Sequence, residues 1–228
     1  MVPEKEITPV RIKFSKTGDL MYISHLDLAR TMQRIIVRSG VDIWYSEGFN
    51  PQPRIVFALP LPVGIESVCE YMDIKINSYM DFEEIKERIS LNFPEEMKVL
   101  DVYSPTVKFK LVSYADYTIK LYSDNISEKT VSDIKELFSH ECTVMKKSKS
   151  GEREVNICDY IKSLDATYCG DYIEIRAVTS ADSEKNLNPE LIVEAIKKHL
   201  GIMNSGSIDE YHTIMRNALL DAELKEFK

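Results

Sequence analysis

The chain has 228 residues, of which 44% are hydrophobic and 29% charged, with a net charge of −8. This balance is typical of a globular protein, and the acidic total argues against indiscriminate nucleic-acid binding. The chain has no apolar run long enough to span a bilayer and no signal-peptide pattern, so we expect no membrane partner. The four cysteines have no metal-site spacing, which favours buried free thiols, no bound metal and a reducing cytoplasm.

Charge is distributed unevenly along the chain. Residues 1–56 contain eight Lys or Arg and six Asp or Glu, whereas the remaining residues carry a net charge of −10. A local basic surface is therefore expected in the first quarter of the chain.

The first half of the chain contains strand and helix patterns in turn. Alternation of Val10, Ile12 and Phe14 with polar residues predicts a half-buried strand. A helix follows from Ser24 to Ser39 and ends at Gly40. The later elements are expected to be a second helix after the N-cap Asp81 and strands at residues 41–45, 55–61, 70–76 and 97–103.

The second half repeats this order more loosely. Strands are predicted at residues 117–121, 142–147 and 172–178, helices at 127–139, 155–164 and 189–200, and a strand or short helix at 211–219. The order strand–helix–strand–strand–helix–strand is typical of a ferredoxin-like unit. We therefore predict an α+β fold of two tandem ferredoxin-like (βαββαβ) units with antiparallel sheets, in residues 1–108 and 109–228.

The helix at residues 24–39 holds the first candidate site residues. Ser24 and Asp27 have the spacing of a capping box, which predicts a structural role for Asp27. Arginines at every fourth position form a row on one face: Arg30, Arg34 and Arg38. This row is either a solvated face or a ridge that contacts phosphate, and the free N–H groups at the helix N-terminus favour the second interpretation.

His25 lies in the first turn of this helix. A neutral histidine beside a phosphate site could be a catalytic general base, contact a ligand or pack as a structural residue. The sequence leaves these three roles open.

The segment from Tyr45 to Arg54 is the second candidate region. Gly48 and the prolines at 51 and 53 predict a rigid loop. It either only joins two strands or presents ligand-binding groups: Glu47, Phe49, Asn50 and Arg54. Farther along the chain, Glu70 shares strand parity with Met72 and is expected to point toward an apolar face. A buried carboxylate there must pair with an arginine such as Arg30 or Arg34, or belong to a site.

Together these motifs resemble a known bacterial family. The order and spacing are similar to the signature of the radical-SAM-linked conserved hypothetical proteins, and the matching residues are Lys16-x-Gly18, Ile23-Ser24-His25-Leu26-Asp27-Leu28, Arg34, Arg38, Ser46-Glu47-Gly48-Phe49-Asn50-Pro51, Pro60-Leu61-Pro62-x-Gly64 and Glu70. The similarity is strong over residues 9–76. In the second half it is limited to residues 154–161 and 188–196.

The resemblance implies a companion of a radical SAM enzyme. Members of the family are found beside, or fused to, a cobalamin-binding radical SAM protein, and that partner would carry the iron–sulfur cluster, S-adenosylmethionine and cobalamin. This chain has no CxxxCxxC motif, so no cofactor is expected in it. The family has no established activity, so no catalytic residue is transferred. Where its loop often has a histidine, this chain has Gln52, which argues against a two-histidine site with His25.

Three functional hypotheses result. The first is a non-catalytic accessory that binds RNA, or another phosphate-bearing substrate, for modification by the radical SAM protein. Arg11, Lys13 and the arginine row would then contact phosphates, and loop residues would contact a base: Tyr45, Phe49 and Asn50. The second is a ribonuclease or nucleotide-processing enzyme that uses His25. The third is a protein-interaction module whose acidic second unit docks onto the radical SAM protein.

Overall fold

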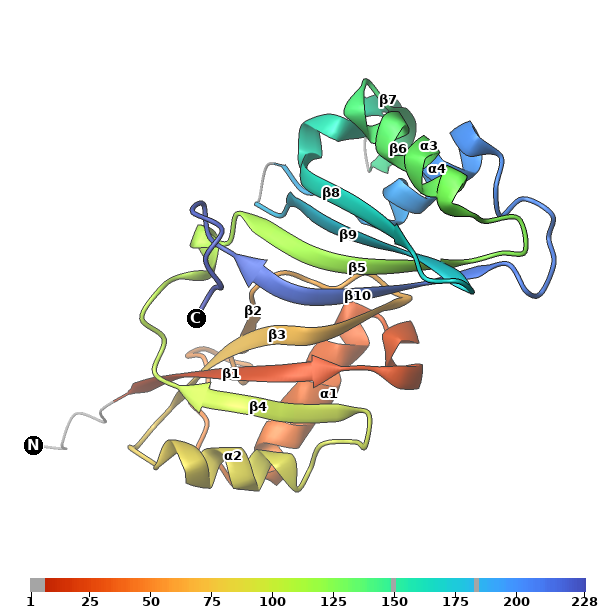
Figure 1. The fold of residues 1–228 in the computed structure, drawn as a ribbon. Coiled ribbons are helices and arrows are strands. Elements are labelled where there is room, and N and C mark those ends of the chain that lie inside the picture. The colour runs from red at the N-terminus through yellow and green to blue at the C-terminus, as the bar shows by residue number, and fades with distance from the viewer. Residues whose placement is uncertain (1–6, 149–150, 183–184) are drawn as a thin grey trace, which may run out of the picture. The chain divides into compact units, whose positions relative to one another are not determined.

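The computed structural model describes residues 7–148, 151–182 and 185–228. Within these ranges the protein has a mixed α+β fold with four α-helices, which confirms the predicted α+β class (Figure 1). The chain divides into two compact units, residues 1–111 with Lys228 and residues 112–227. Inside each unit the strands of the sheet pair in an antiparallel manner.

In the described ranges no helix combines the length and the apolar character that a membrane crossing requires.

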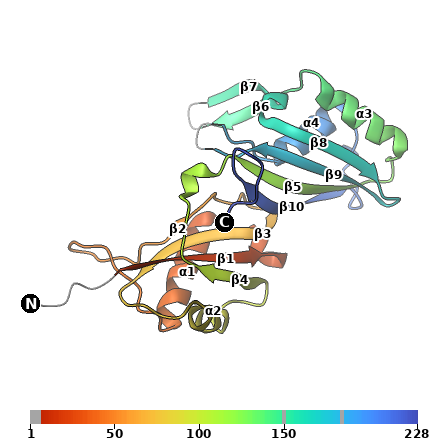
Figure 2. The same ribbon diagram turned by 60° about the vertical axis from the view of Figure 1, so that its left-hand side comes forward.

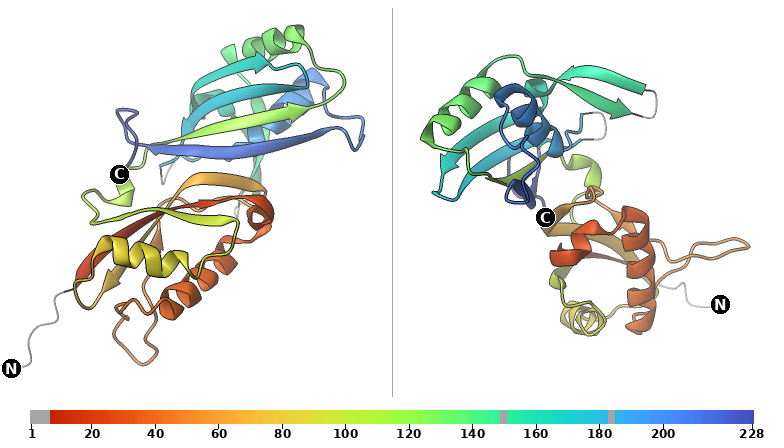
Figure 3. Two further views of the ribbon diagram at one scale, coloured as in Figure 1. Left: turned by 60° about the horizontal axis from the view of Figure 1, so that its bottom comes forward. Right: turned by 90° about the vertical axis from the view of Figure 1, so that its right-hand side faces the viewer.

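Unit 1 contains an antiparallel sheet in the order β4-β1-β3-β2. Its strands are β1 (Thr8–Lys16), β2 (Val56–Phe57), β3 (Ile65–Ile76) and β4 (Met97–Tyr103). Helices α1 (His25–Arg38) and α2 (Phe82–Ser90) cover one face of this sheet (Figure 3). The two helices follow the first and third strands in the chain, so each returns across the same face.

Strand alternation places the core of unit 1 under these helices. The apolar positions of β1 and β3 are fully buried: Val10, Ile12, Phe14, Met72, Ile74 and Ile76. Helix α1 adds the stripe Leu28, Met32, Ile35 and Ile36. Burying an aliphatic side chain of this size stabilises a fold by about 1.5–3 kcal/mol, so this stripe fixes the position of α1 on the sheet.

Two predicted strands of unit 1 are much shorter than expected. Residues 41–45 make only isolated bridges, from Ile43 to Ile76 and from Tyr45 to Pro53. Of residues 55–61, only β2 is a strand. Pro60 lies within the second segment, and further prolines stand close to it, at positions 51, 53 and 62. Because proline has no N–H group to donate, ladders cannot extend through these positions.

Unit 2 contains a second antiparallel sheet, in the order β10-β5-β9-β8 (Figure 2). Its strands are β5 (Tyr114–Tyr122), β8 (Ile161–Tyr168), β9 (Tyr172–Ser180) and β10 (Tyr211–Leu220). Helices α3 (Glu128–Ser139) and α4 (Glu190–Leu200) contact each other. Strands β6 (Thr143–Ser148) and β7 (Gly151–Asn156) form a separate hairpin.

The helix predicted at residues 155–164 is wrong. These residues form the end of β7, a 3₁₀ turn (Ile157–Tyr160) and the start of β8. Asn156 caps only this turn, since its Oδ1 accepts a hydrogen bond from the Cys158 amide at 3.2 Å. The apolar residues between positions 155 and 164 have a spacing that suits a helix. Residues 161–164 instead belong to β8, whose backbone forms hydrogen bonds with β9.

Candidate functional site

The N-terminus of α1 is closed by its own side chains. Ser24 Oγ accepts a hydrogen bond from the Asp27 amide at 3.2 Å and donates one to Asp27 Oδ2 at 2.8 Å. The predicted N-cap is therefore confirmed. The cap therefore uses the Asp27 amide, which is one of the N–H groups that were expected to attract an anion.

His25 packs against an aromatic ring. Its imidazole meets the Phe57 ring edge-to-face, with centroids 5.1 Å apart and planes at 81°. Among the described residues, no side-chain hydrogen bond or ion pair involving His25 is found. A general base needs a partner or substrate proton within hydrogen-bond reach, and no protein side chain provides one here.

The arginine row lies exposed along α1. Arg30 pairs with Asp27 at 3.5 Å, and both side chains are 61% exposed, so this pair stabilises little. Arg34 and Arg38 are also exposed, and within the described ranges neither has an acidic partner. Arg38 Nε donates to the carbonyl of Arg34 at 3.4 Å. Two guanidinium groups are thus left available to an external anion.

These two arginines are far from His25 along the helix. At about 1.5 Å per residue, Arg34 is about 13 Å and Arg38 about 20 Å from the first turn. They occupy the C-terminal half of α1, where the helix dipole favours cations rather than anions. The arginine row and the helix N-terminus therefore do not form one anion site.

The predicted rigid loop is a short hairpin. The Ser46 amide donates to the Gln52 carbonyl at 3.0 Å, and the Gln52 amide donates to Ser46 Oγ at 3.1 Å. Gly48 has a φ of 124°, which a residue with a Cβ rarely adopts. Phe49 at the tip is fully exposed. The three polar candidates of the segment are also exposed: Glu47, Asn50 and Arg54.

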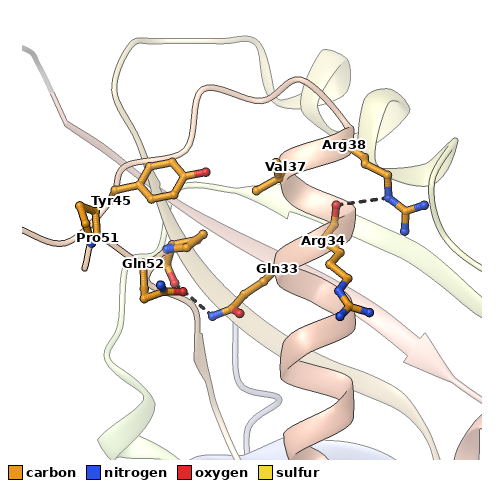
Figure 4. Close-up of a pocket in the computed structure, with 8 residues that line it drawn as sticks. Gln33, Arg34, Val37, Arg38, Tyr45, Pro51 and Gln52 are labelled. Atoms are coloured by element: carbon orange, nitrogen blue, oxygen red, sulfur yellow. Dashed lines mark hydrogen bonds between the residues drawn. The ribbon is translucent and has the colours of Figure 1, made fainter. Parts of the chain in front are cut away.

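A groove of about 560 Å³ lies between the C-terminal half of α1 and this hairpin (Figure 4). Helix α1 contributes Gln33, Arg34, Val37 and Arg38, and the hairpin contributes Tyr45, Pro51, Gln52 and Pro53. Gln33 Nε2 donates to the Pro53 carbonyl at 3.4 Å and joins the two walls. The volume falls within the roughly 300–1,000 Å³ of small-molecule sites.

Only part of the predicted site reaches this groove. Arg34, Arg38 and Tyr45 line it, whereas the other candidates lie elsewhere on unit 1: Ser24, His25, Arg30, Glu47, Phe49, Asn50, Arg54 and Glu70. The sequence interpretation missed Gln33 and Val37. They lie one position before Arg34 and Arg38 and four residues apart, so a helical projection would have placed them on the adjoining face.

Glu70 lies inside unit 1. It pairs in register with Phe14 and is 3% exposed, as its strand parity predicted. Arg30 and Arg34, its proposed partners, are both exposed on α1, and the ion pair found for Arg30 is with Asp27. Glu70 does not line the groove.

The expectation that Arg11 contacts phosphate is wrong. Its side chain is fully buried, and its Nε and Nη2 atoms bind the two carboxylate oxygens of Asp73 at 2.8 and 2.9 Å. Nη2 also donates to the Val107 carbonyl at 2.8 Å, and the guanidinium lies 4.3 Å from the Phe109 ring centre. Lys13 is half-buried, with its ammonium 5.6 Å from the Tyr71 ring centre.

The cysteines differ in exposure. Cys69 and Cys142 are buried, Cys158 is partly buried and Cys169 is exposed, so the expectation of four buried thiols is wrong for Cys169, which lies in the turn after β8. Burial raises the pKa of the Cys142 thiol to about 11 and also raises the pKa of Cys158. Both thiols are therefore poor nucleophiles at neutral pH.

Unit 2 has a second hollow, of about 340 Å³, near the ends of β5, β8 and β10. Its walls include three tyrosines and three aspartates: Tyr122, Tyr168, Tyr211, Asp124, Asp171 and Asp209. Tyr122 and Tyr211 stack with ring centres 4.4 Å apart. No group of three or more His, Cys, Asp or Glu side chains in the described part of the chain could hold a metal ion.

The fold and the groove define a mixed α+β protein with an open, largely apolar groove next to exposed arginines. Residues 10–189 match the model of a bacterial family that is described as "Uncharacterized protein conserved in bacteria (DUF2344)". The chain belongs to this family. No curated protein matches the chain.

Solved structures show only remote similarity. A chain of a Cbf5–Nop10–Gar1 complex is 8% identical with a TM-score of 0.45, and the alignment covers 91% of this chain and 47% of that one. This chain thus spans about half the length of that structure. An unknown protein from Galdieria sulphuraria is 7% identical with a TM-score of 0.27, over 92% of this chain and 99% of that one. No function is inferred from either.

Proposed function

We propose that the protein is a non-catalytic accessory that binds RNA, or another phosphate-bearing substrate, for modification by a partner enzyme. The observation that carries this proposal is the pair Arg34 and Arg38, which are exposed and have no acidic partner among the described residues. A guanidinium group binds phosphate oxygens through two parallel N–H bonds. The Tyr45 ring, which is 41% exposed, adds an aromatic surface to the same groove.

The partner that we propose is a radical SAM protein in the bacterial cytoplasm. The support is the resemblance of residues 9–76 to the radical-SAM-linked family. The iron–sulfur cluster, S-adenosylmethionine and cobalamin would belong to that partner, since this chain has no CxxxCxxC motif. The present chain would hold the substrate while the partner performs the chemistry.

We also propose that each unit is a ferredoxin-like unit, so that the two form a tandem pair. Two features support this. The sheet orders β4-β1-β3-β2 and β10-β5-β9-β8 are equivalent when the strands of each sheet are counted in chain order. Each unit also has two helices, after its first and third sheet strands. In unit 2 the β6–β7 hairpin would be an insertion. A fold of this kind does not identify a function.

A charge-reversal series tests the RNA proposal. The intact protein is mixed with single-stranded RNA at low salt, and binding is measured by fluorescence anisotropy. We expect Arg34→Glu and Arg38→Glu each to weaken binding by tenfold or more, because a phosphate contact is replaced by repulsion. Arg176→Glu is the matched control: Arg176 is exposed on unit 2 and outside the groove. No binding by the wild type, or equal losses in all three variants, would exclude the proposal.

The interaction module is the second candidate, because of the charge of unit 2. Residues 112–227 contain 21 acidic and 14 basic residues, and three aspartates line the unit 2 hollow. Such a surface would attract a basic patch on the radical SAM protein. Co-purification with that protein after nuclease treatment, lost on Asp124→Lys with Asp171→Lys, would favour this candidate. It would replace the first candidate only if RNA binding were absent.

A further inference from the structure

The walls of the unit 1 groove are mainly apolar and face each other. Figure 4 shows the Tyr45 ring opposite Val37, with Pro51 beside it. Tyr45 is 41% exposed and Val37 is 49% exposed. Val37 is thus left open, whereas its neighbour Ile36 on the same helix is fully buried. A flat apolar ligand would cover both side chains.

Two amide side chains sit between these apolar walls. Gln33 Nε2 donates to the Pro53 carbonyl at 3.4 Å, and Gln52 Nε2 donates to Asn50 Oδ1 at 3.1 Å. Each amide therefore uses one donor within the described residues and keeps a second N–H and its carbonyl oxygen for a ligand. A donor beside an acceptor is the arrangement that reads the edge of a nucleobase.

The hairpin wall is held in place before any ligand binds. Two hydrogen bonds link Ser46 and Gln52, and a bridge links Tyr45 and Pro53. The opposite wall is α1, which the core stripe fixes on the sheet. Little conformational entropy is then lost when a ligand enters, which favours affinity.

The charges at the rim select an anionic ligand. Among the residues that line the groove none is acidic, whereas Arg34 and Arg38 are both basic. Figure 4 shows their guanidinium groups on the side of α1 away from Tyr45. A ligand that fills the groove and also reaches these groups must carry its negative charge outside its flat apolar part. A nucleotide has this construction: a planar base and a separate phosphate.

From these features we infer that the groove takes one unstacked base of single-stranded RNA, with the neighbouring phosphates on Arg34 and Arg38. This inference rests on the proposed function and adds its substrate class. Duplex RNA cannot use such a site, because its bases are stacked and paired. If only the arginines bound RNA, single and double strands would both be held by their phosphates.

The experiment follows one base directly. A short single-stranded RNA that carries 2-aminopurine is titrated with the intact protein, and base fluorescence and anisotropy are recorded together. We expect binding to quench the fluorescence, since the base stacks on Tyr45. Tyr45→Leu should weaken binding by about tenfold or more and remove the quenching, whereas Tyr45→Phe keeps both because it keeps the ring. The matched control is Tyr79→Leu, at a tyrosine that is 71% exposed and outside the groove.

The outcomes separate this inference from the proposed function. Equal affinity for duplex and single strand, or unchanged quenching in Tyr45→Leu, overturns the base site, while a loss in Arg34→Glu would still support RNA binding. No RNA binding by the wild type overturns both. If Tyr45→Leu abolishes co-purification with the radical SAM protein but leaves RNA affinity intact, the groove is a protein-docking surface. Emission from Trp44, the single tryptophan, reports in each variant whether this segment stays folded.

Discussion

Removal of Asp73 tests the most buried charge in unit 1. The Arg11 side chain is fully buried, and Asp73 binds it with two bonds of 2.8 and 2.9 Å. Loss of one member of a buried ion pair typically costs about 3–5 kcal/mol. Here the aspartate is 28% exposed, and Arg11 keeps the Val107 carbonyl and the Phe109 ring. We therefore expect Asp73→Ala to lower the free energy of unfolding by about 2–3 kcal/mol.

Urea unfolding followed by circular dichroism measures this loss. With a slope of about 1–3 kcal/mol per molar urea, the midpoint should fall by about 1 M or more. The control is Glu84→Ala, which removes an exposed 2.6 Å pair with Arg88 and should cost about 0.5 kcal/mol or less. Arg11→Met combined with Asp73→Ala should recover part of the loss, since an apolar replacement removes the stranded charge. Equal effects of Asp73→Ala and Glu84→Ala would refute the buried pair.

Three further predictions concern the site and the thiols. Replacing Arg34 and Arg38 together by glutamine should reduce the slope of log affinity against log salt by about 1.4 for single-stranded RNA, and an unchanged slope would contradict phosphate contacts there. Neither the wild type nor His25→Ala should cleave RNA, and the two should bind RNA with the same affinity. RNA cleavage by the wild type that is lost in His25→Ala would instead support a nuclease. Because Cys142 has a pKa raised from 9.0 to about 11, the unfolded chain releases this proton first as the pH rises. Stability should therefore fall between pH 9 and 11 by up to about 1.4 kcal/mol per pH unit, and Cys142→Ala should show a smaller fall.

Local patterns in the sequence predicted much of unit 1. The N-cap at Ser24, the apolar stripe of α1 and the parity of Glu70 depend on residues within a few positions of one another. Arg11 differs because its environment is set by Asp73, which lies 62 residues away on the paired strand. Alternation showed that Arg11 points away from the helices. The alternation pattern could not show that the Asp73 carboxylate faces Arg11, because that depends on the register between β1 and β3.

The groove illustrates the same limit for the site. Helical spacing could place Gln33, Arg34 and Val37 on neighbouring faces of α1, and proline content could predict a rigid hairpin. Nothing in either segment specifies that they approach each other. That approach follows from the Gln33–Pro53 hydrogen bond and from β2, which holds the chain after the hairpin against β3. The site was therefore predicted as two separate motifs and is assembled by tertiary contacts.

Within α1, the residues that resemble the family signature consequently divide between the two ends of the helix. Ser24 and His25 close and pack the N-terminal end, whereas Arg34 and Arg38 border the groove about 13–20 Å away. If phosphate is bound by these guanidinium groups rather than by the helix N-terminus, the two positions can be separated by mutation. Ser24→Ala should cost about 0.5–2 kcal/mol of stability through loss of the cap and leave RNA affinity unchanged. A loss of affinity in folded Ser24→Ala protein would instead place the phosphate at the helix N-terminus and contradict the site argued from the groove.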